Sequence, residues 1–471
     1  MECEQGGKLH IVVEGCAHGE LDNIYASIQR IESDRGIRVD LLICCGDFEA
    51  MRSEDDLPSL AVPAKYRHLN SFHKYYSGEK AAPVLTIFIG GNHEASNYMQ
   101  ELNYGGWAAP NMYYLGTAGA VTLGGLRIAG LSGIYKAKDY RRGRHERPPY
   151  DPNTLRSVYH VREYEVYKLA QLTGLVDIFL SHDWPQGIEQ FGDTDGLIRA
   201  KPFFAQEIRD NSLGSPAGMT LLRALKPRYW FSGHLHVKFA GIVPHDCGHP
   251  TRFLALDKCL PRREFLQLIT LDRPDGETGP PQLMYDLEWL AIVKATHSLL
   301  SPHSHAVSLP QESKRIDEAA KAWVLQRLEG DLTIPHNFTV TARTSRDPPS
   351  QPRGSGQMIG NPQTDAFLGM LELQHVVTVP WQGVEGGMQG SHGELLDASP
   401  TVEDVAGDPN EIDFDHEGSD SRDPNEIDLD VDDDEEDEPK EADRQDCGAA
   451  VSDPAAIDID IDDIDDNFTA A

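Results

Sequence analysis

Short apolar runs separated by polar stretches mark the first 271 residues of the chain. Each run spans four to seven residues, a length typical of a strand that is buried on one or both faces. The predicted strands cover residues 9–14, 40–45, 84–90, 126–131, 176–180, 227–232 and 253–256. Between the first two, Leu21, Ile24, Ile28 and Ile31 fall on one face of a helix predicted over 21–33. This alternation predicts a layered α/β domain over residues 8–275.

The pattern changes after the last of these strands. Residues 276–342 contain two amphipathic segments, 285–295 and 312–328, and predict a small helical domain. Residues 343–382 begin with a stretch rich in Ser, Pro, Arg and Gly, which predicts a linker with one helix over 366–373. From 383 to 471 the apolar content falls and charge rises, which predicts a disordered acidic tail.

Most of the negative charge belongs to that tail. The net charge is −34, and residues 401–471 hold 29 acidic against 3 basic side chains, so −26 of the total lies there. The remaining 400 residues are mildly acidic. The overall charge therefore does not exclude a body that binds phosphate.

The tail also repeats itself. Residues 408–415 read DPNEIDFD, residues 423–430 read DPNEIDLD, and residues 453–460 read DPAAIDID. Acidic residues that alternate with Ile, Leu and Phe do not build a packed core. Two interpretations stay open: a solubilising tail, or a repeated motif that docks on a basic surface of a splicing or RNA-turnover protein.

Targeting segments and cysteine usage indicate the cellular compartment. No apolar run approaches the roughly 20 residues of a membrane-spanning helix, so no membrane partner is expected. The N-terminal residues lack the apolar segment of a secretory signal. The seven cysteines show no disulfide framework, which favours the cytosol or the nucleus.

Five short polar segments follow predicted strands and carry the candidate chemistry. A single histidine at a strand end is more often structural than catalytic, but five His-, Asp- and Asn-rich segments in series are hard to produce by accident. Glycines beside them let the backbone pass close to a metal or a phosphate. The segments are GCAHG at 15–19, GDF at 46–48, GNHE at 91–94, SHD at 181–183 and SGHLH at 232–236.

The order and residue types resemble the calcineurin-like metallophosphoesterase superfamily, with its pattern D-x-H, G-D, G-N-H-D/E, H and G-H-x-H. The resemblance covers about residues 9–260 and implies a four-layer αββα sandwich that holds two divalent metal ions. In such sites two ions about 3.5–4 Å apart clamp the attacking and leaving oxygens. The implied ligands are Cys16, His18 and His236 at the first pocket, Asn92, His182 and His234 at the second, and Asp47 between them.

Three further roles follow from the same resemblance. His93 is expected to face the substrate, where it protonates the leaving oxygen or stabilises charge on the phosphate. Glu94 and Asp183 are expected to orient the histidine ligands from behind.

Cys16 departs from the superfamily pattern, which has Asp at this position. A thiolate is a softer ligand than a carboxylate and favours zinc or iron over magnesium or calcium. The expected cofactors are two divalent ions, Fe(II), Zn(II) or Mn(II). The alternative is a packed cysteine that only lines the pocket.

With Cys at position 16, the chain resembles a narrower family, the RNA lariat debranching enzymes. Other stretches agree with it, at residues 16–22, 46–52, 89–116, 132–140, 156–165 and 180–188. This resemblance implies hydrolysis of the 2′-5′ phosphodiester at the branch point of excised intron lariats, giving linear RNA with a 5′-phosphate and a free 2′-OH. It also implies branched RNA as the partner and the nucleus as the place of work. The alternatives are a nuclease or phosphomonoesterase of the superfamily, or a scaffold that has lost catalysis.

A basic segment at 135–147 interrupts the series of metal-binding segments. Basic side chains interleaved with aromatic rings suit a single-stranded RNA backbone and its bases, and the debranching family has a lariat-recognition loop here. A solvated loop and a nuclear-import signal are the alternatives. The predicted RNA contacts in this segment are Lys136, Lys138, Tyr140, Arg141, Arg142 and Arg144.

Four further side chains near the metal-binding segments have two interpretations each. Arg52 and Tyr76 are predicted to contact the phosphate or sugar of the RNA. Trp107 and Trp184 are either core residues or stacking platforms.

Overall fold

A computed structural model describes residues 7–274, 277, 279–310, 315–347 and 358–382. The described residues up to Trp381 belong to one compact unit. The predicted acidic tail and its repeats lie outside the described residues. Among the helices that are described, none combines the length and the apolar character needed to cross a membrane.

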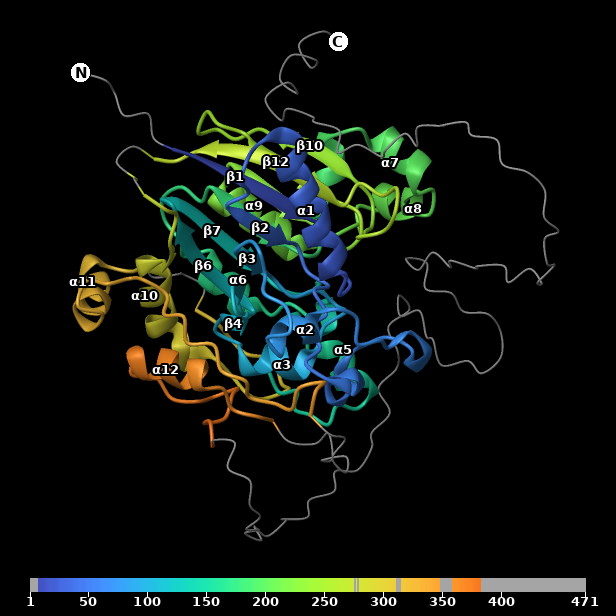
Figure 1. The fold of residues 1–471 in the computed structure, drawn as a ribbon. Coiled ribbons are helices and arrows are strands. Elements are labelled where there is room, and N and C mark those ends of the chain that lie inside the picture. Colours follow the sequence, from blue (N-terminus) through green and yellow to red (C-terminus); the bar gives the residue numbers. More distant parts are fainter. Residues whose placement is uncertain (1–6, 275–276, 278, 311–314, 348–357, 383–471) are drawn as a thin grey trace, which may run out of the picture. The chain divides into compact units, whose positions relative to one another are not determined.

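Two β-sheets form the centre of this unit (Figure 1). The first has the order β12-β1-β2-β3-β5-β4, in which β1, β2, β3 and β5 run parallel and the two edge strands run antiparallel. Its strands are β1 (Lys8–Glu14), β2 (Leu41–Cys44), β3 (Thr86–Phe88), β4 (Gly106–Ala109), β5 (Met112–Tyr114) and β12 (Leu266–Asp272).

The second sheet has the order β10-β11-β9-β8-β7-β6-β13, with a parallel centre from β11 to β7. Its strands are β6 (Ala118–Leu123), β7 (Leu126–Leu131), β8 (Ile178–Ser181), β9 (Tyr229–Ser232), β10 (Phe239–Val243), β11 (Thr251–Ala255) and β13 (Leu283–Tyr285).

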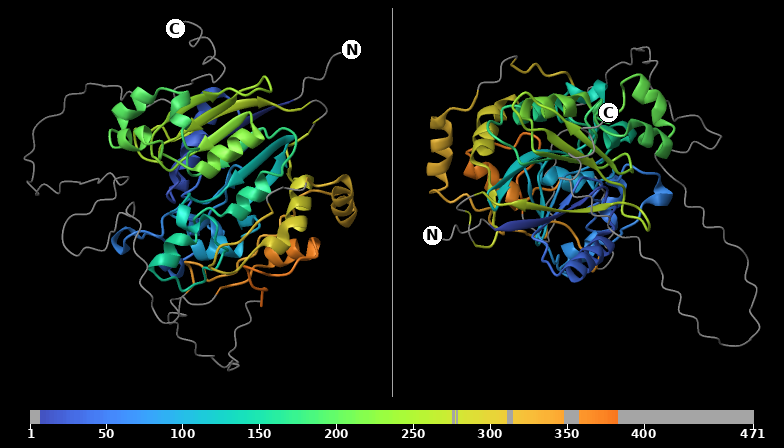
Figure 2. Two further views of the ribbon diagram at one scale, coloured as in Figure 1. Left: turned by 180° about the vertical axis from the view of Figure 1, so that it is seen from behind. Right: turned by 90° about the horizontal axis from the view of Figure 1, so that it is seen from above.

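Helices cover the outer faces of both sheets (Figure 2). The described helices are α1 (Leu21–Arg35), α2 (Phe72–Tyr76), α3 (Ser96–Glu101), α4 (Ala137–Tyr140), α5 (Pro152–Ser157), α6 (Glu163–Leu169), α7 (Thr194–Ala200), α8 (Phe204–Arg209), α9 (Pro216–Leu225), α10 (Leu287–Thr296), α11 (Glu318–Arg327) and α12 (Pro362–Met370).

Three apolar clusters hold the layers together. Ile11 of β1 and Ile43 of β2 pack between the sheets with Ile128 of β7. A second cluster joins α1 to the outer face of the first sheet, and a third joins α6, α9 and α10 to the outer face of the second. Burying both faces of each sheet explains why the central strands read as continuous apolar runs. The predicted four-layer αββα sandwich is confirmed.

The region predicted as a linker is only partly described, and its described parts are packed. On α12, Phe367 and Leu368 are buried in the cluster beneath the second sheet. Gln363 bonds the backbone of Trp107 on β4 twice, accepting from its N–H at 2.7 Å and donating to its C=O at 2.9 Å. Residues 358–382 are therefore folded onto the sheets, and their description as a linker was wrong.

Candidate metal centre and active site

The polar segments converge because each follows the carboxyl end of a parallel strand. Cys16 comes after β1, Asp47 after β2, Asn92 after β3, His182 after β8 and His234 after β9. The carboxyl ends of parallel strands share one edge of a sheet, which is where open α/β sheets place their sites. Here both sheets supply residues to one place, since His182 after β8 lies 3.2 Å from Asp47 after β2.

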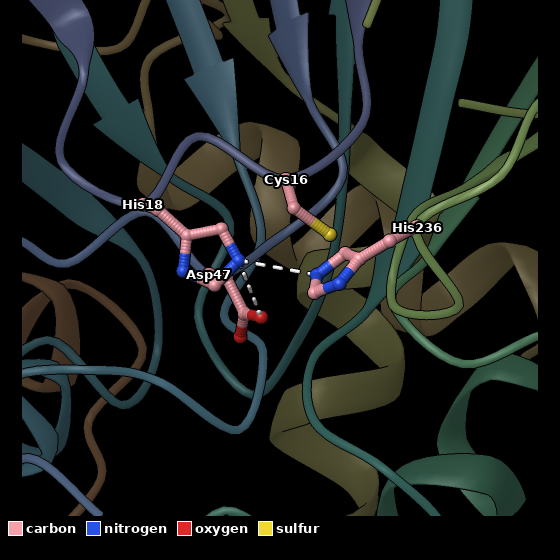
Figure 3. Close-up of side chains that lie close together, drawn as sticks. All are labelled: Cys16, His18, Asp47 and His236. Atoms are coloured by element: carbon pink, nitrogen blue, oxygen red, sulfur yellow. Dashed lines mark hydrogen bonds and ion pairs between the residues drawn. The ribbon is translucent and has the colours of Figure 1, made fainter. Parts of the chain in front are cut away.

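The first cluster consists of Cys16, His18, Asp47 and His236, each of which offers a ligand atom within 4.8 Å of the others (Figure 3). The Nε2 atoms of His18 and His236 lie 3.2 Å apart, and His18 Nε2 lies 3.6 Å from Asp47 Oδ2. A sulfur, two imidazoles and a carboxylate oxygen facing one point are a donor set that fits a divalent transition metal.

The second cluster shares Asp47 with the first. Asp47 Oδ1 lies 3.2 Å from His182 Nε2, which lies 3.1 Å from Asn92 Oδ1. The rings of His182 and His234 are 4.9 Å apart between centroids. One carboxylate thus presents one oxygen to each cluster, as expected for a group that bridges two ions. The structure brings all seven predicted ligands together.

Tight backbone turns aim these side chains. His18, Asp47, His234 and His236 have φ between 42° and 67°, in the left-handed region that side chains rarely adopt. Each such residue costs about 1–3 kcal/mol and persists where the surrounding structure enforces it, often at functional sites. A Cβ at Gly91 would collide with Asp47, so glycine is required at this close approach.

Cys16 is fully buried, and its Sγ accepts a hydrogen bond from the His234 backbone N–H at 2.9 Å. Burial, followed by the nearby charges of Asp47 and Glu14, raises the pKa of the thiol well above its usual range. A cation in the first cluster would have to displace that proton, since thiolate is the ligand form. The position of Sγ within the donor cluster favours a ligand over a packed cysteine.

The histidine ligands are oriented through their other ring nitrogen. His182 Nδ1 lies 2.8 Å from the Cys45 carbonyl oxygen, so it carries the proton and leaves Nε2 bare toward the pocket. His18 Nδ1 lies 3.1 Å from Glu49 Oε1, and Glu49 Oε2 accepts from Asn70 Nδ2 at 3.0 Å. The sequence prediction missed Glu49. Its only signal was an acidic residue two positions after Asp47.

The groups predicted to orient histidines act elsewhere. Glu94 accepts from the backbone amides of Phe48, Glu49 and Gly91 at 2.8–3.0 Å, and burial raises its pKa to about 8. Glu94 therefore joins the loop that carries Asp47 to the loop that carries Asn92. It does not orient a histidine, which corrects the prediction.

Asp183 also needs a correction. Its Oδ2 accepts from the backbone N–H of Tyr135 at 3.1 Å, and burial raises its pKa to about 6. It fixes the start of the basic segment instead of orienting a histidine ligand.

His93 lies at the mouth of the first cluster. Its backbone N–H donates to Asp47 Oδ1 at 2.8 Å, and its ring centroid lies 5.4 Å from that of His18. Burial is the main cause that lowers the pKa of the imidazole. His93 is thus beside the candidate metal ligands without being one of the seven.

The basic segment divides into exposed and buried side chains. Lys136, Lys138, Arg141 and Arg142 are exposed, and Tyr140 is half-buried against Tyr135. These positions are compatible with RNA contact.

Arg144 is buried, in contrast, with its Nε 3.1 Å from Glu165 Oε1 and its Nη1 donating to the Val158 carbonyl at 2.9 Å. Its predicted RNA contact does not fit this structure, because the guanidinium is already neutralised in the core.

Arg52 and Tyr76 are likewise core residues. Arg52 is 1% exposed, forms ion pairs with Asp56 and Glu101 at 2.9 and 2.7 Å, and covers the ring of Tyr98 at 4.1 Å. The hydroxyl of Tyr76, also 1% exposed, accepts from the backbone N–H of Thr341 at 2.8 Å. Direct RNA contact by either side chain was a wrong prediction.

The two tryptophans that sequence left undecided are core residues. Both are fully buried, and the indole N–H of Trp107 donates to Pro335 while that of Trp184 donates to Gly233.

Comparison with known proteins agrees with this geometry. Residues 9–238 match the calcineurin-like phosphoesterase family, and residues 248–376 match the lariat debranching enzyme C-terminal domain.

Similar proteins include the lariat debranching enzyme of Danio rerio, 50% identical over 82% of this chain and 69% of that one. Lariat debranching enzyme A of Xenopus laevis is 52% identical over 78% of this chain and 71% of its own. The Arabidopsis thaliana lariat debranching enzyme is 50% identical over 78% and 87%, respectively.

Proposed function

Because the chain belongs to the lariat debranching enzyme family, a group of metal-dependent phosphodiesterases, we propose that it hydrolyses the 2′-5′ phosphodiester at the branch point of lariat RNA. The observation that supports this most is the pair of donor clusters on either side of Asp47, with His93 beside them. Cations held by such a pair would bind the phosphate of a phosphodiester such as the branch point of RNA.

Bound divalent cations would supply Lewis acidity and a more acidic water. The seven ligands would hold those cations, and Glu94 fixes the loops that carry Asp47 and Asn92 through its bonds to the backbone amides of Phe48, Glu49 and Gly91. Water adds to phosphorus, the bond from phosphorus to the branch 2′-oxygen breaks, and that oxygen takes a proton. The products are linear RNA with a 5′-phosphate and a free 2′-OH.

We assign the proton delivery to His93. Its ring lies beside the ligand His18, with the two ring centroids 5.4 Å apart. The imidazole then donates to the departing 2′-oxygen.

We further propose Fe(II), Zn(II) or Mn(II) as the ions. The sulfur and two imidazoles of the first cluster suit iron or zinc, and the oxygen atoms of Asp47 and Asn92 suit Mn(II). The exposed Lys136, Lys138, Arg141 and Arg142 would pair with RNA phosphates.

A branched RNA and a linear 3′-5′ RNA of the same length test the reaction. The proposal expects the full chain, loaded with Mn(II), to cut only the 2′-5′ linkage and to release an arm with a 5′-phosphate. Equal cleavage of the linear RNA would indicate a general nuclease. No cleavage of either RNA, with metal bound, would indicate a scaffold.

We propose separately that the acidic repeats at 408–415, 423–430 and 453–460 dock a splicing or RNA-turnover protein, and that the protein works in the nucleus. Both ideas rest on the sequence alone. Removing residues 383–471 should leave debranching unchanged and alter the proteins that co-purify. Unchanged co-purifying proteins would leave only a solubilising role.

A further inference from the structure

The basic segment 135–147 is attached to a distant part of the chain, residues 301–307 of the C-terminal domain. We propose that these two segments form one binding surface for an RNA arm that leaves the active site, and that His303 and His305 stack on its bases. This inference rests on the proposed debranching function and adds a site to it.

The near end of the surface begins at the metal centre. Tyr135 N–H donates to Asp183 Oδ2 at 3.1 Å, and Asp183 directly follows the ligand His182. The next residue, Lys136, is exposed. An RNA arm held at the metal centre would therefore meet the basic segment first.

The far end of the basic segment is paired with residues 301–307 through the backbone. Arg144 N–H donates to the Ser301 carbonyl and Val307 N–H donates to the Arg141 carbonyl, both at 2.8 Å. Arg142 and Ala306 form an antiparallel bridge between these two bonds. The two segments are thus neighbours at a fixed register.

The two segments approach so closely at Gly143 that no side chain fits at this position. A Cβ built at Gly143 would collide with the carbonyl oxygens of Ser301 and His303. Those oxygens belong to the backbone and have no rotamer by which to move aside. Any side chain at position 143 should therefore push the two segments apart.

The outward side of this pairing carries cations and flat rings. The side chains of Arg141 and Arg142 are 71% and 44% exposed, and each also lies near a carboxylate, Glu163 at 3.6 Å and Asp139 at 3.0 Å. His303 and His305 are exposed, and their rings stack with centroids 5.2 Å apart and an interplanar angle of 14°.

Exposed rings beside guanidinium groups suit single-stranded RNA, because bases stack on imidazole while phosphates pair with arginine. An isolated exposed histidine would not indicate a site where RNA bases stack. Here two rings are already stacked, and the backbone pairing fixes them next to the segment that leads from the metal centre.

The test compares two branched RNAs on the full-length protein loaded with Mn(II). One has arms of about ten nucleotides, a length that can reach beyond the metal centre, and the other is a minimal branched trinucleotide. The variant is His303→Ala with His305→Ala. We expect KM for the long-armed RNA to rise about tenfold with kcat unchanged, and both constants for the minimal RNA to stay as in the wild type.

Two further variants separate stacking from other causes. His303→Tyr with His305→Tyr keeps two flat rings and should restore the wild-type KM on the long-armed RNA. Gly143→Val should raise KM on that RNA as the alanine pair does, because it separates the segments. Arg199→Ala, which removes an exposed cation on α7 outside both segments, serves as the control.

The outcomes distinguish failure of this inference from failure of the proposed debranching function. A wild-type KM in the alanine pair on the long-armed RNA would overturn the inference while the proposed function stands. An equal effect on the minimal RNA would also overturn it, by showing damage to the centre instead of loss of an arm contact. If the wild type opens neither branched RNA, the proposed function itself fails.

Discussion

Replacing Glu49 should loosen the first metal cluster through His18. The carboxylate holds the proton on His18 Nδ1 at 3.1 Å, which leaves Nε2 bare toward Cys16, Asp47 and His236. In Glu49→Ala this support is lost, and the imidazole can turn or take the other tautomer. Outer partners of this kind change metal affinity by about 10–100-fold, or about 1.4–2.7 kcal/mol.

Glu49→Gln provides the matched comparison. Its amide oxygen can still accept from His18 Nδ1, but its NH₂ group then faces Asn70 Nδ2, which donates to Glu49 Oε2 at 3.0 Å in the wild type. Affinity should therefore fall in the order wild type, Gln, Ala. Glu318→Gln, at an 89% exposed side chain on α11, is the control.

Calorimetric titration of metal-free protein with Mn(II) measures the affinity, and long-range ¹H–¹⁵N spectra of the histidines report the His18 tautomer. The reasoning would be refuted if Glu49→Ala bound Mn(II) as tightly as the wild type with the tautomer unchanged. Equal losses in the Ala and Gln variants would instead point to the charge of Glu49, not to its hydrogen bond.

Three other substitutions test separate parts of the account. His93→Ala should abolish turnover while metal analysis still finds the wild-type content, since His93 lies outside the seven ligands; lost metal would reverse its role. Cys16→Asp should shift metal preference toward harder ions such as Mg(II), and an unchanged profile in competition binding would support a packed cysteine. Arg52→Ala should lower the free energy of unfolding by about 3–5 kcal/mol, because Asp56 and Glu101 are left buried without their cation. Urea unfolding measures that loss, and a stable variant with a raised KM would restore the RNA-contact hypothesis.

Sequence patterns located the metal ligands because the ligands stand in the same relation to the fold. Each candidate segment follows a buried apolar strand, at 9–14, 40–45, 84–90, 176–180 or 227–232, and the resemblance to the metallophosphoesterases then assigned the ligands among them. The predicted strand over 126–131 was also recovered with its bounds unchanged in β7. Parallel pairing then brings such strand ends together, whatever lies between them in sequence.

The burial of charged side chains could not be predicted from the sequence in this way. Arg52 closely follows a metal-binding segment and Arg144 lies in the basic segment. Their neighbours in sequence gave no hint of Glu101 or Glu165, which form ion pairs with them from other parts of the chain. Glu49 was missed for the complementary reason, since its partner His18 lies 31 residues away.

Short strands and the C-terminal segment were missed because tertiary contacts define them. Gly and Ala make up most of β4 and half of β6, and they have little strand preference of their own. Residues 358–382 have a linker-like sequence before them, and their folding shows in the burial of Phe367 and Leu368 and in the bonds of Gln363 to Trp107.

A crystal structure of protein purified without chelator, with anomalous data at the Mn, Fe and Zn edges, tests the central claim most directly. The account predicts anomalous peaks on both sides of Asp47, one bounded by Cys16, His18 and His236 and the other by Asn92, His182 and His234. Density that leaves these side chains without a metal at saturating concentrations, or places the metal elsewhere, would contradict it.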